Sequence, residues 1–374
     1  GSSKMKIPKG ADMVDAYGKT IIPGLIDVHA HMGLEWDGLS SEQNWHYLAN
    51  LAFGVTTTHD PSRDTEMVFA NSELQKAGKI LAPRIYSTGT ILYGAVTGFT
   101  AEVNGLDDAR RALKRIKAFG GFSVKSYNQP RREQRQQILK AARELDMLVY
   151  PEGGSTFQHN LNMLVDGHTG IEHSIPVSPL YKDALTLYGE SGVGYTPTLV
   201  VSYGGLWGEN YWYSKMKIFE HQHLQGFFPQ PLLDQKRRRM KIEEDDWNHI
   251  ENAKAAKALS DAGVKVNNGA HGQLEGLGVH WEMWMLAQGG MSPMEALRAS
   301  TLNGAEYLGM GDDLGSLEAG KLADLVILGK NPLDDIENSD SVEMVMLNGR
   351  LYEAKTMNEL VTGDSKRLPH WWEE

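Results

Sequence analysis

Short apolar runs alternate along the chain with longer stretches in which apolar residues recur every three or four positions. The short runs are typical of buried parallel strands, and the longer stretches are typical of helices with one buried face. The strand-like runs are 25–28, 55–58, 84–87, 122–125, 147–150, 170–173, 194–197 and 264–267. The helix-like stretches between them include 107–119, 131–145 and 249–262. This pattern predicts an α/β fold in which the βα units close a (β/α)8 TIM-like barrel.

The last part of the chain has a different pattern. Residues 314–328 and 342–350 have the character of short strands separated by Gly and Asn-Gly turns, which is typical of β-hairpins. We therefore expect the barrel to occupy residues 21–312, and a small β appendage with a tail to occupy residues 313–374.

A long segment, 199–249, separates the last two strand-like runs and is rich in Trp, Tyr and Gly. Insertions on the carboxyl-terminal face of a barrel commonly form a lid or a substrate wall. Its aromatic side chains could line a pocket, but packing onto the barrel is the preferred interpretation because large aromatics dominate ordinary cores. These residues are Tyr203, Trp207, Tyr211, Trp212 and Tyr213.

Composition restricts the partners and the chemistry. The 374 residues carry a formal net charge of -11, which argues against a nucleic-acid surface because such a surface needs clustered Lys and Arg. There is no uninterrupted apolar stretch of about 18 residues, so we expect no membrane-spanning helix. The absence of cysteine excludes a Cys-ligated zinc and leaves histidines and carboxylates as the strong metal ligands.

Histidines gather at the ends of the strand-like runs. In a parallel barrel all of these ends open on one face, so side chains far apart in the sequence meet there. His29 and His31 are two residues apart on a strand, which puts both rings on the same side and lets one ion bind both. The side chains at or just after other strand ends are His59, Lys125, Glu152, His173 and His271. This convergence favours a metal centre.

Several motifs resemble those of the amidohydrolase superfamily. They are 23–31 (Pro-Gly-Leu-Ile-Asp-Val-His-Ala-His), 54–57 (Gly-Val-Thr-Thr), 171–173 (Ile-Glu-His) and the closing segment 315–326. Within the superfamily the chain is similar to the prolidase and imidazolonepropionase-like branch. More narrowly, segments 124–134, 151–154 and 269–273 resemble the amidohydrolase modules found behind TolB-type β-propellers. The resemblance implies a hydrolase that uses one or two divalent metal ions, with zinc as the first choice.

The resemblance also implies a ligand set. Lys125 stands where members with two metals carry a carboxylated lysine that bridges the ions, whereas an unmodified Lys125 would be a barrel lysine paired with Glu152. Glu152 stands where the branch usually carries histidine, and a carboxylate is a chemically acceptable substitute. His159 competes with Glu152 for this role. The residues that match the other ligand positions are His29, His31 and His173.

His271 departs from the superfamily pattern because it replaces the aspartate that accepts the proton of the attacking water. A neutral imidazole can act as general base, so we expect His271 to do so, with activity lost below about pH 6 to 7 if its pKa is ordinary. Lost activity is the alternative consequence. His59 is interpreted as a support for a ligand or as a packing residue.

Other polar residues are assigned to substrate or to structure. Tyr127, Asn128 and Gln273 flank the expected site and are candidate substrate contacts. The histidines that fit no strand end are interpreted as structural or surface residues, and they are His168, His221, His223, His249, His280 and His370.

The predicted reaction is hydrolysis of an amide-like C–N bond, in a small peptide or an N-acyl compound, by a metal-activated water. One alternative keeps the metal site but acts on a lactone, carbamate or phosphoester, because a fold does not fix its substrate. A second alternative is a catalytically inactive binding module attached to a β-propeller. A homo-oligomer is compatible with each of these readings.

The start of the chain also bears on its origin. Superfamily members usually carry a strand-rich segment before the first barrel strand, and we interpret residues 1–20 as the remnant of that segment. The β-sandwich appendage is then expected to be truncated at its N-terminal side. We further expect the chain to be part of a longer protein, exported if the propeller resemblance holds, and the absence of cysteine permits this.

Overall fold

The computed structural model describes residues 7–33, 38–93, 100–127, 131–154, 156–237 and 241–373. All of the expected strands are confirmed there. They are β2 (Leu25–Asp27), β3 (Val55–Asp60), β4 (Arg84–Ser87), β7 (Ser123–Ser126), β8 (Leu148–Pro151), β9 (Gly170–Glu172), β10 (Gly194–Thr196) and β11 (Lys265–Val266). Two more short strands are β5 (Ile91–Tyr93) and β6 (Thr100–Glu102).

These strands are parallel and form three hydrogen-bonded sheets, with the orders β2-β3-β4, β6-β5-β7-β8 and β11-β10-β9. A parallel bridge between Glu152 and Glu172 joins the end of β8 to β9. The amide of Val28 donates to Asn268 O at 3.1 Å, which joins the segment after β2 to the segment after β11. The protein is therefore a mixed α/β fold built on parallel strands.

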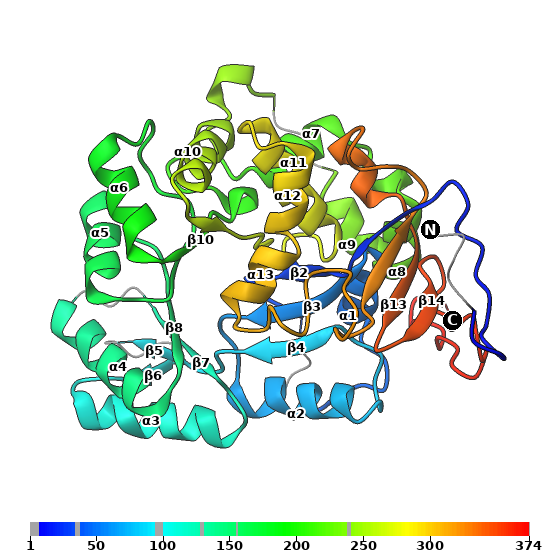
Figure 1. The fold of residues 1–374 in the computed structure, drawn as a ribbon, viewed down its shortest axis with the longest axis horizontal. Helices are drawn as coiled ribbons and strands as arrows, with labels where there is room; N and C mark the ends of the chain where they lie inside the picture. The colour runs from blue at the N-terminus through cyan, green and yellow to red at the C-terminus, as the bar shows by residue number, and fades with distance from the viewer. Residues whose placement is uncertain are drawn as a thin grey trace.

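Helices connect the strands. Figure 1 shows α2 to α6 on the outer side of the parallel strands. On α3, buried Ala109, Leu113 and Ile116 recur at helical spacing, so this helix forms because one apolar face can pack on the strands. The expected helices 107–119, 131–145 and 249–262 are confirmed as α3, α4 and α10. The connecting helices are α2 (Thr65–Lys76), α3 (Leu106–Ala118), α4 (Arg132–Leu145), α5 (Phe157–Asp166), α6 (Lys182–Ser191) and α10 (His249–Asp261).

Four more helices complete this part of the fold, and they are α1 (Trp45–Ala52), α11 (Leu277–Gln288), α12 (Pro293–Ala299) and α13 (Leu302–Tyr307). Ten residues of α11 are buried, because it packs against α10 and α12, against η4 (Ile336–Asp340), and against η1 (Leu199–Val201) and α7 (Glu209–Lys215) of the insertion. None of the helices within the described residues is both long and apolar enough to cross a membrane.

The insertion after β10 is mostly helical. Trp212 stacks on Trp281 of α11 with ring centroids 6.4 Å apart, and Tyr213 meets the same ring edge-on at 5.2 Å. Tyr211 packs edge-on against Trp247 at 5.5 Å. Trp212 and Tyr213 thus pack the insertion onto the fold as predicted. The contact of Tyr211 with Trp247, in contrast, lies within the insertion, and Trp207 is exposed instead of packed. The elements of the insertion are η1 (Leu199–Val201), α7 (Glu209–Lys215), η2 (Ile218–Glu220), α8 (Gln222–Phe227), α9 (Gln230–Gln235) and η3 (Glu244–Asp246).

A separate four-stranded antiparallel sheet has the order β1-β12-β13-β14, and Figure 1 shows it beside both ends of the chain. It combines β1 (Thr20–Pro23) with β12 (Leu325–Leu328), β13 (Val342–Leu347) and β14 (Arg350–Glu353). Asn348 and Gly349 make the tight turn between the last two strands, both with positive φ (53° and 76°), as the Asn-Gly signal predicted. Residues 314–324 were expected to be part of a strand but form turns, and only 325–328 are extended.

Candidate metal centre

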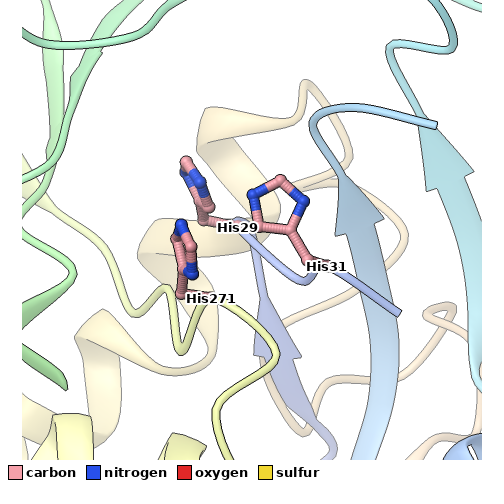
Figure 2. A group of neighbouring side chains, drawn as sticks. All are labelled: His29, His31 and His271. Atoms are coloured by element: carbon pink, nitrogen blue, oxygen red, sulfur yellow. The ribbon is translucent and has the colours of Figure 1, made fainter. Parts of the chain in front are cut away.

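Six of the side chains predicted to form the site are brought together by the ends of the parallel strands. In Figure 2 the rings of His29 and His31, just after β2, converge with the ring of His271, from the loop after β11. The remaining members are Lys125 on β7, Glu152 after β8 and His173 after β9. The clustering follows from the parallel arrangement, because all of these strands end at the same side.

The cluster contains two groups of potential ligands, and His29 belongs to both. One group is His29, His31 and His271, and the other is His29, Glu152 and His173. Within each group one ligand atom from every residue lies within 4.8 Å of the others. Each group could therefore hold a metal ion.

His29 is fully buried, and its two nitrogens differ in their surroundings. Nδ1 lies 2.7 Å from Glu172 Oε2, whereas Nε2 has no hydrogen-bond partner among the described residues. Burial, and then the charge of Lys125, lower the pKa of His29 well below its ordinary value. The ring is thus neutral, and a buried lone nitrogen without a partner is costly unless something binds it. This orphaned atom fits a metal ligand.

His31 is held by the loop after β3. Its Nδ1 lies 3.2 Å from Ser62 Oγ and 3.7 Å from Asp60 Oδ1. Asp60 also accepts a hydrogen bond from the Met32 amide at 3.1 Å and pairs with Arg63 Nε at 3.3 Å. Burial lowers the pKa of His31, and the bond with Asp60 partly opposes this. Asp60 therefore anchors the segment that carries His31.

His271 approaches the first two rings closely, with its centroid 5.2 Å from that of His29 and 4.5 Å from that of His31. Glycines on both sides allow this approach: a Cβ at Gly269 would lie 2.7 Å from His29 Cβ, and one at Gly272 would lie 2.2 Å from His31 O. Burial and then the neighbouring His31 lower the pKa of His271 to about 2. An ordinary pKa, the condition stated from the sequence, therefore does not hold, because the ring is buried and lies beside His31, His173 and Lys125.

Glu152 is the carboxylate of the cluster, and three polar side chains contact it. Lys125 Nζ lies 2.6 Å from its Oε2, His173 Nε2 lies 2.8 Å from its Oε1, and the Tyr203 hydroxyl donates to Oε1 at 2.9 Å. Burial would raise the pKa of Glu152, but Lys125 and His173 bring it well below the ordinary value. Glu152 is thus ionised although it is buried, as a metal ligand would need to be.

Lys125 is almost fully buried and pairs with Glu152, which is the contact expected for the unmodified lysine. Its ammonium also lies 5.4 Å from the ring centroid of Tyr127. Carboxylation of Lys125 remains a prediction. Of the three residues predicted to contact substrate, Tyr127 lies beside the cluster because it contacts Lys125. Gln273 lies in the turn after His271, and Asn128 lies outside the described residues.

Two further histidines were weighed from the sequence. His159, on α5, is in neither ligand group, whereas the competing Glu152 is in one of them. His59 bonds to Val28 O through Nδ1 at 3.2 Å and to Ser123 Oγ through Nε2 at 2.9 Å. The geometry thus gives Glu152 the place beside His173 and makes His59 a packing residue within the strands.

The sequence did not assign a site role to Tyr203 or Glu172. The ring of Tyr203 stacks on His173 with centroids 4.6 Å apart, although packing on the fold was the preferred interpretation for this residue. The one feature of the local sequence that could have pointed to Tyr203 is the Gly204-Gly205 pair that follows it, because such a pair is typical of a turn. Glu172 directly precedes His173 in the sequence, but its side chain contacts His29. Nothing in the strand pattern predicted this contact between Glu172 and His29.

The remaining histidines have structural contacts. His280, for example, bonds to Phe53 O at 2.9 Å and to Ser339 Oγ at 3.0 Å. His223 bonds to Val342 O at 3.0 Å, and His168 bonds to Met163 O at 3.0 Å. Burial lowers the pKa of each of these three rings to about 4.

Comparison with known families gives one match over most of the chain. The model of the Amidohydrolase family matches residues 20–352. Two imidazolonepropionases match shorter segments. The protein from Symbiobacterium thermophilum is 59% identical over 39 residues, covering 10% of this chain and 9% of that protein. The protein from Shouchella clausii is 34% identical over 93 residues, covering 22% of this chain and 21% of that protein. The matched segments thus span about a tenth to a fifth of these curated relatives.

Solved structures match over nearly the whole chain. A Xaa-Pro dipeptidase with bound methionine has a TM-score of 0.70 and 22% identity, with 93% of this chain and 90% of that chain covered. A putative prolidase from Bifidobacterium longum has a TM-score of 0.69 and 22% identity, with 98% and 86% covered. At this identity the likeness concerns the fold.

Proposed function

Because the chain belongs to the amidohydrolase family, we propose that it is a metal-dependent hydrolase that cleaves an amide-like C–N bond. One observation carries the proposal: His29 belongs to both groups of potential metal ligands, and its buried Nε2 has no hydrogen-bond partner among the described residues. A buried nitrogen without a partner is energetically costly, and a cation bound between these ligand groups would supply the missing partner.

The donor set fits a divalent cation. Imidazole and carboxylate ligands suit zinc, which we take as the first candidate, and also suit other first-row metals. When bound, such a cation polarises a carbonyl and lowers the pKa of a bound water to near 7. Activation of water for attack on an amide carbon is the chemistry that this cluster would then support.

The residues of the cluster would take different roles in holding the metal. His29, His31 and His271 would hold one cation, and Glu152 and His173 would hold a second, with a carboxylated Lys125 as the bridge. His29 offers a single free nitrogen, because Glu172 occupies the other. The alternative role of His271 as general base is retained as a competing hypothesis, since a ring nitrogen that binds a cation cannot also accept a proton.

We infer that the parallel strands close as a (β/α)8 barrel. Support comes from the links between the three sheets: the bridge between Glu152 and Glu172, the hydrogen bond from Val28 to Asn268, and the short step of three residues from β4 to β5. A closed barrel explains why the ends of β2, β8, β9 and β11 open on one site. The four-stranded antiparallel sheet would be the β appendage.

Small peptides are the first substrates to test. The structural neighbours include a Xaa-Pro dipeptidase, and the curated relatives are imidazolonepropionases, so dipeptides with proline and cyclic amides head the list. N-acyl compounds follow them. Lactones, carbamates and phosphoesters belong in the same screen because the fold does not fix the substrate.

The test is metal content together with hydrolysis. Purified protein should contain about one or two equivalents of metal by inductively coupled plasma mass spectrometry, and a chelator should remove both metal and activity, with zinc restoring activity. The His29→Ala/His31→Ala variant should lose stoichiometric metal. The matched control is His249→Ala, which removes a buried histidine of α10 that belongs to neither ligand group. Wild-type metal content in the double variant would show that the ligand set is wrong.

A further inference from the structure

A buried carboxylate and a buried phenol hold His29 from the side opposite its free nitrogen. Glu172 Oε2 lies 2.7 Å from His29 Nδ1, and the hydroxyl of Tyr307 donates to Glu172 Oε1 at 2.6 Å. The Thr196 hydroxyl donates to the same Oε1 at 3.4 Å. All of these side chains are buried. Since Tyr307 and Thr196 both use Oε1, Oε2 is left for His29.

The strands are shaped to admit the Tyr307 ring. Gly170 of β9 lies opposite Gly194 of β10 in the parallel register. A Cβ at Gly170 would lie 1.6 Å from Tyr307 Oη, and a Cβ at Gly194 would lie 2.4 Å from its Cε2. Any larger residue at either position would displace the phenol, so both glycines are required by this packing.

The same two strands supply the partners of the hydroxyl. Glu172 and Thr196 also face each other in the register, two residues beyond the glycines and therefore on the same side of the strands. Glycine admits the ring, and the polar pair receives its hydroxyl.

The orientation of Tyr307 is fixed from a third direction. The Tyr150 hydroxyl donates to Tyr307 O at 3.0 Å, and the two rings pack with centroids 4.9 Å apart. Tyr307 ends α13, which follows the last parallel strand, so this contact joins the closing helices to the ligand cluster. Because the Tyr307 ring is fixed in this way, its hydroxyl is directed at Glu172 Oε1.

We propose that Glu172 and Tyr307 are positioning residues that keep the ring hydrogen of His29 on Nδ1, so that Nε2 presents its lone pair to the metal centre. The Nδ1 hydrogen donates to Glu172 Oε2, and Tyr307 holds the carboxylate in place. The inference rests on the proposed function, because it assigns the free Nε2 to a metal ion. Outer partners of this kind commonly change metal affinity by about 10- to 100-fold.

The first test measures zinc affinity by competition with a chromogenic chelator. Glu172→Gln keeps the size of the side chain but replaces one of its two oxygens with an NH2 group, and Tyr307→Phe removes only the hydroxyl. Both variants should bind zinc about 10- to 100-fold more weakly than the wild type. The matched control is Tyr188→Phe, because Tyr188 is a buried tyrosine whose hydroxyl has no partner among the described residues, and its affinity should not change. Wild-type affinity in both site variants would overturn the proposal.

The second test separates this inference from the proposed function. In metal-free protein labelled with 15N-histidine, the His29 signals, assigned by their loss in His29→Gln, should report hydrogen on Nδ1. Glu172→Gln should shift the population toward hydrogen on Nε2. If the wild type binds no zinc, the proposed function fails while this measurement still decides the role of Glu172. A wild-type His29 with hydrogen on Nε2 would overturn the positioning role even where zinc binds.

Discussion

The Tyr203 hydroxyl donates to Glu152 Oε1 at 2.9 Å, which ties the insertion after β10 to the ligand cluster. The backbone carbonyl of Tyr203 accepts hydrogen bonds from the side chains of Asn248 and Asn252 at 2.9 and 3.1 Å, so the residue is anchored on both sides. Burial and the nearby Glu152 raise the pKa of Tyr203 above its ordinary range, and the phenol stays a donor. The insertion thus supplies, through Tyr203, one of the hydrogen-bond donors to Glu152.

Tyr203→Phe should lower turnover by about 10- to 100-fold, because a hydrogen bond to a buried carboxylate contributes roughly 1.5 to 3 kcal/mol. Metal content should fall less than turnover, since Lys125 and His173 still contact Glu152. Tyr211→Phe is the matched control, from the same insertion but packed on Trp212 and Trp247. Equal turnover in the two variants would leave Tyr203 as a packing residue.

Lys125→Ala should abolish activity, because it removes the bridge if Lys125 is carboxylated, and otherwise leaves the buried Glu152 without its closest cation. Short carboxylic acids should restore a small part of the rate if the missing group is a carbamate. Wild-type protein supplied with 13C-bicarbonate should then show a carbamate carbon signal that Lys125→Arg lacks. Absence of that signal in active enzyme would leave Lys125 as the ion-pair partner of Glu152.

His271→Asn should lower zinc content, because His271 shares a potential ligand group with His29 and His31. His271→Asp offers a carboxylate in its place and should retain more metal than the Asn variant. The competing role as general base requires a different result: full metal content in His271→Asn with turnover lowered by about 100-fold or more. Unchanged metal and turnover together would make His271 a structural residue.

The stability of the protein should fall as pH drops from about 6.5 toward 4. Burial lowers the pKa of His168 from 6.5 to about 4, so the unfolded state takes up a proton in this interval that the folded state does not. Protonation therefore favours unfolding, and the contribution of His168 should reach about 2 kcal/mol near pH 4.5.

His168→Asn tests this assignment, because the Asn amide can still donate to Met163 O but cannot be protonated. Urea denaturation at pH 7 and pH 4.5 should show a smaller loss of unfolding free energy in the variant than in the wild type. An identical loss in both proteins would assign the dependence to the other buried histidines, such as His223 and His280.

The sequence by itself determined the strands and pointed to the first two candidate ligands. The runs that became β2 to β4 and β7 to β11 could be located because short runs with β-branched, aromatic and other apolar residues alternate with helical stretches, which is a local property. The spacing of His29 and His31 was also informative, since the two rings lie in one potential ligand group. However, β2 ends at Asp27, and so the pleat expected from the sequence does not set their direction. The Asn348-Gly349 turn was likewise predicted from the local sequence.

Only the tertiary structure decided which distant residues meet. Tyr307 reaches Glu172 because Gly170 and Gly194 lie side by side in neighbouring strands, and no periodicity in the chain encodes that register. The condition of an ordinary pKa for His271 did not hold for a related reason, since burial among His29, His31 and His173 follows from how the strand ends converge. Local pattern is fixed by each segment's own side chains. The partners of a buried polar group, and hence its charge, depend on packing between segments far apart in the sequence.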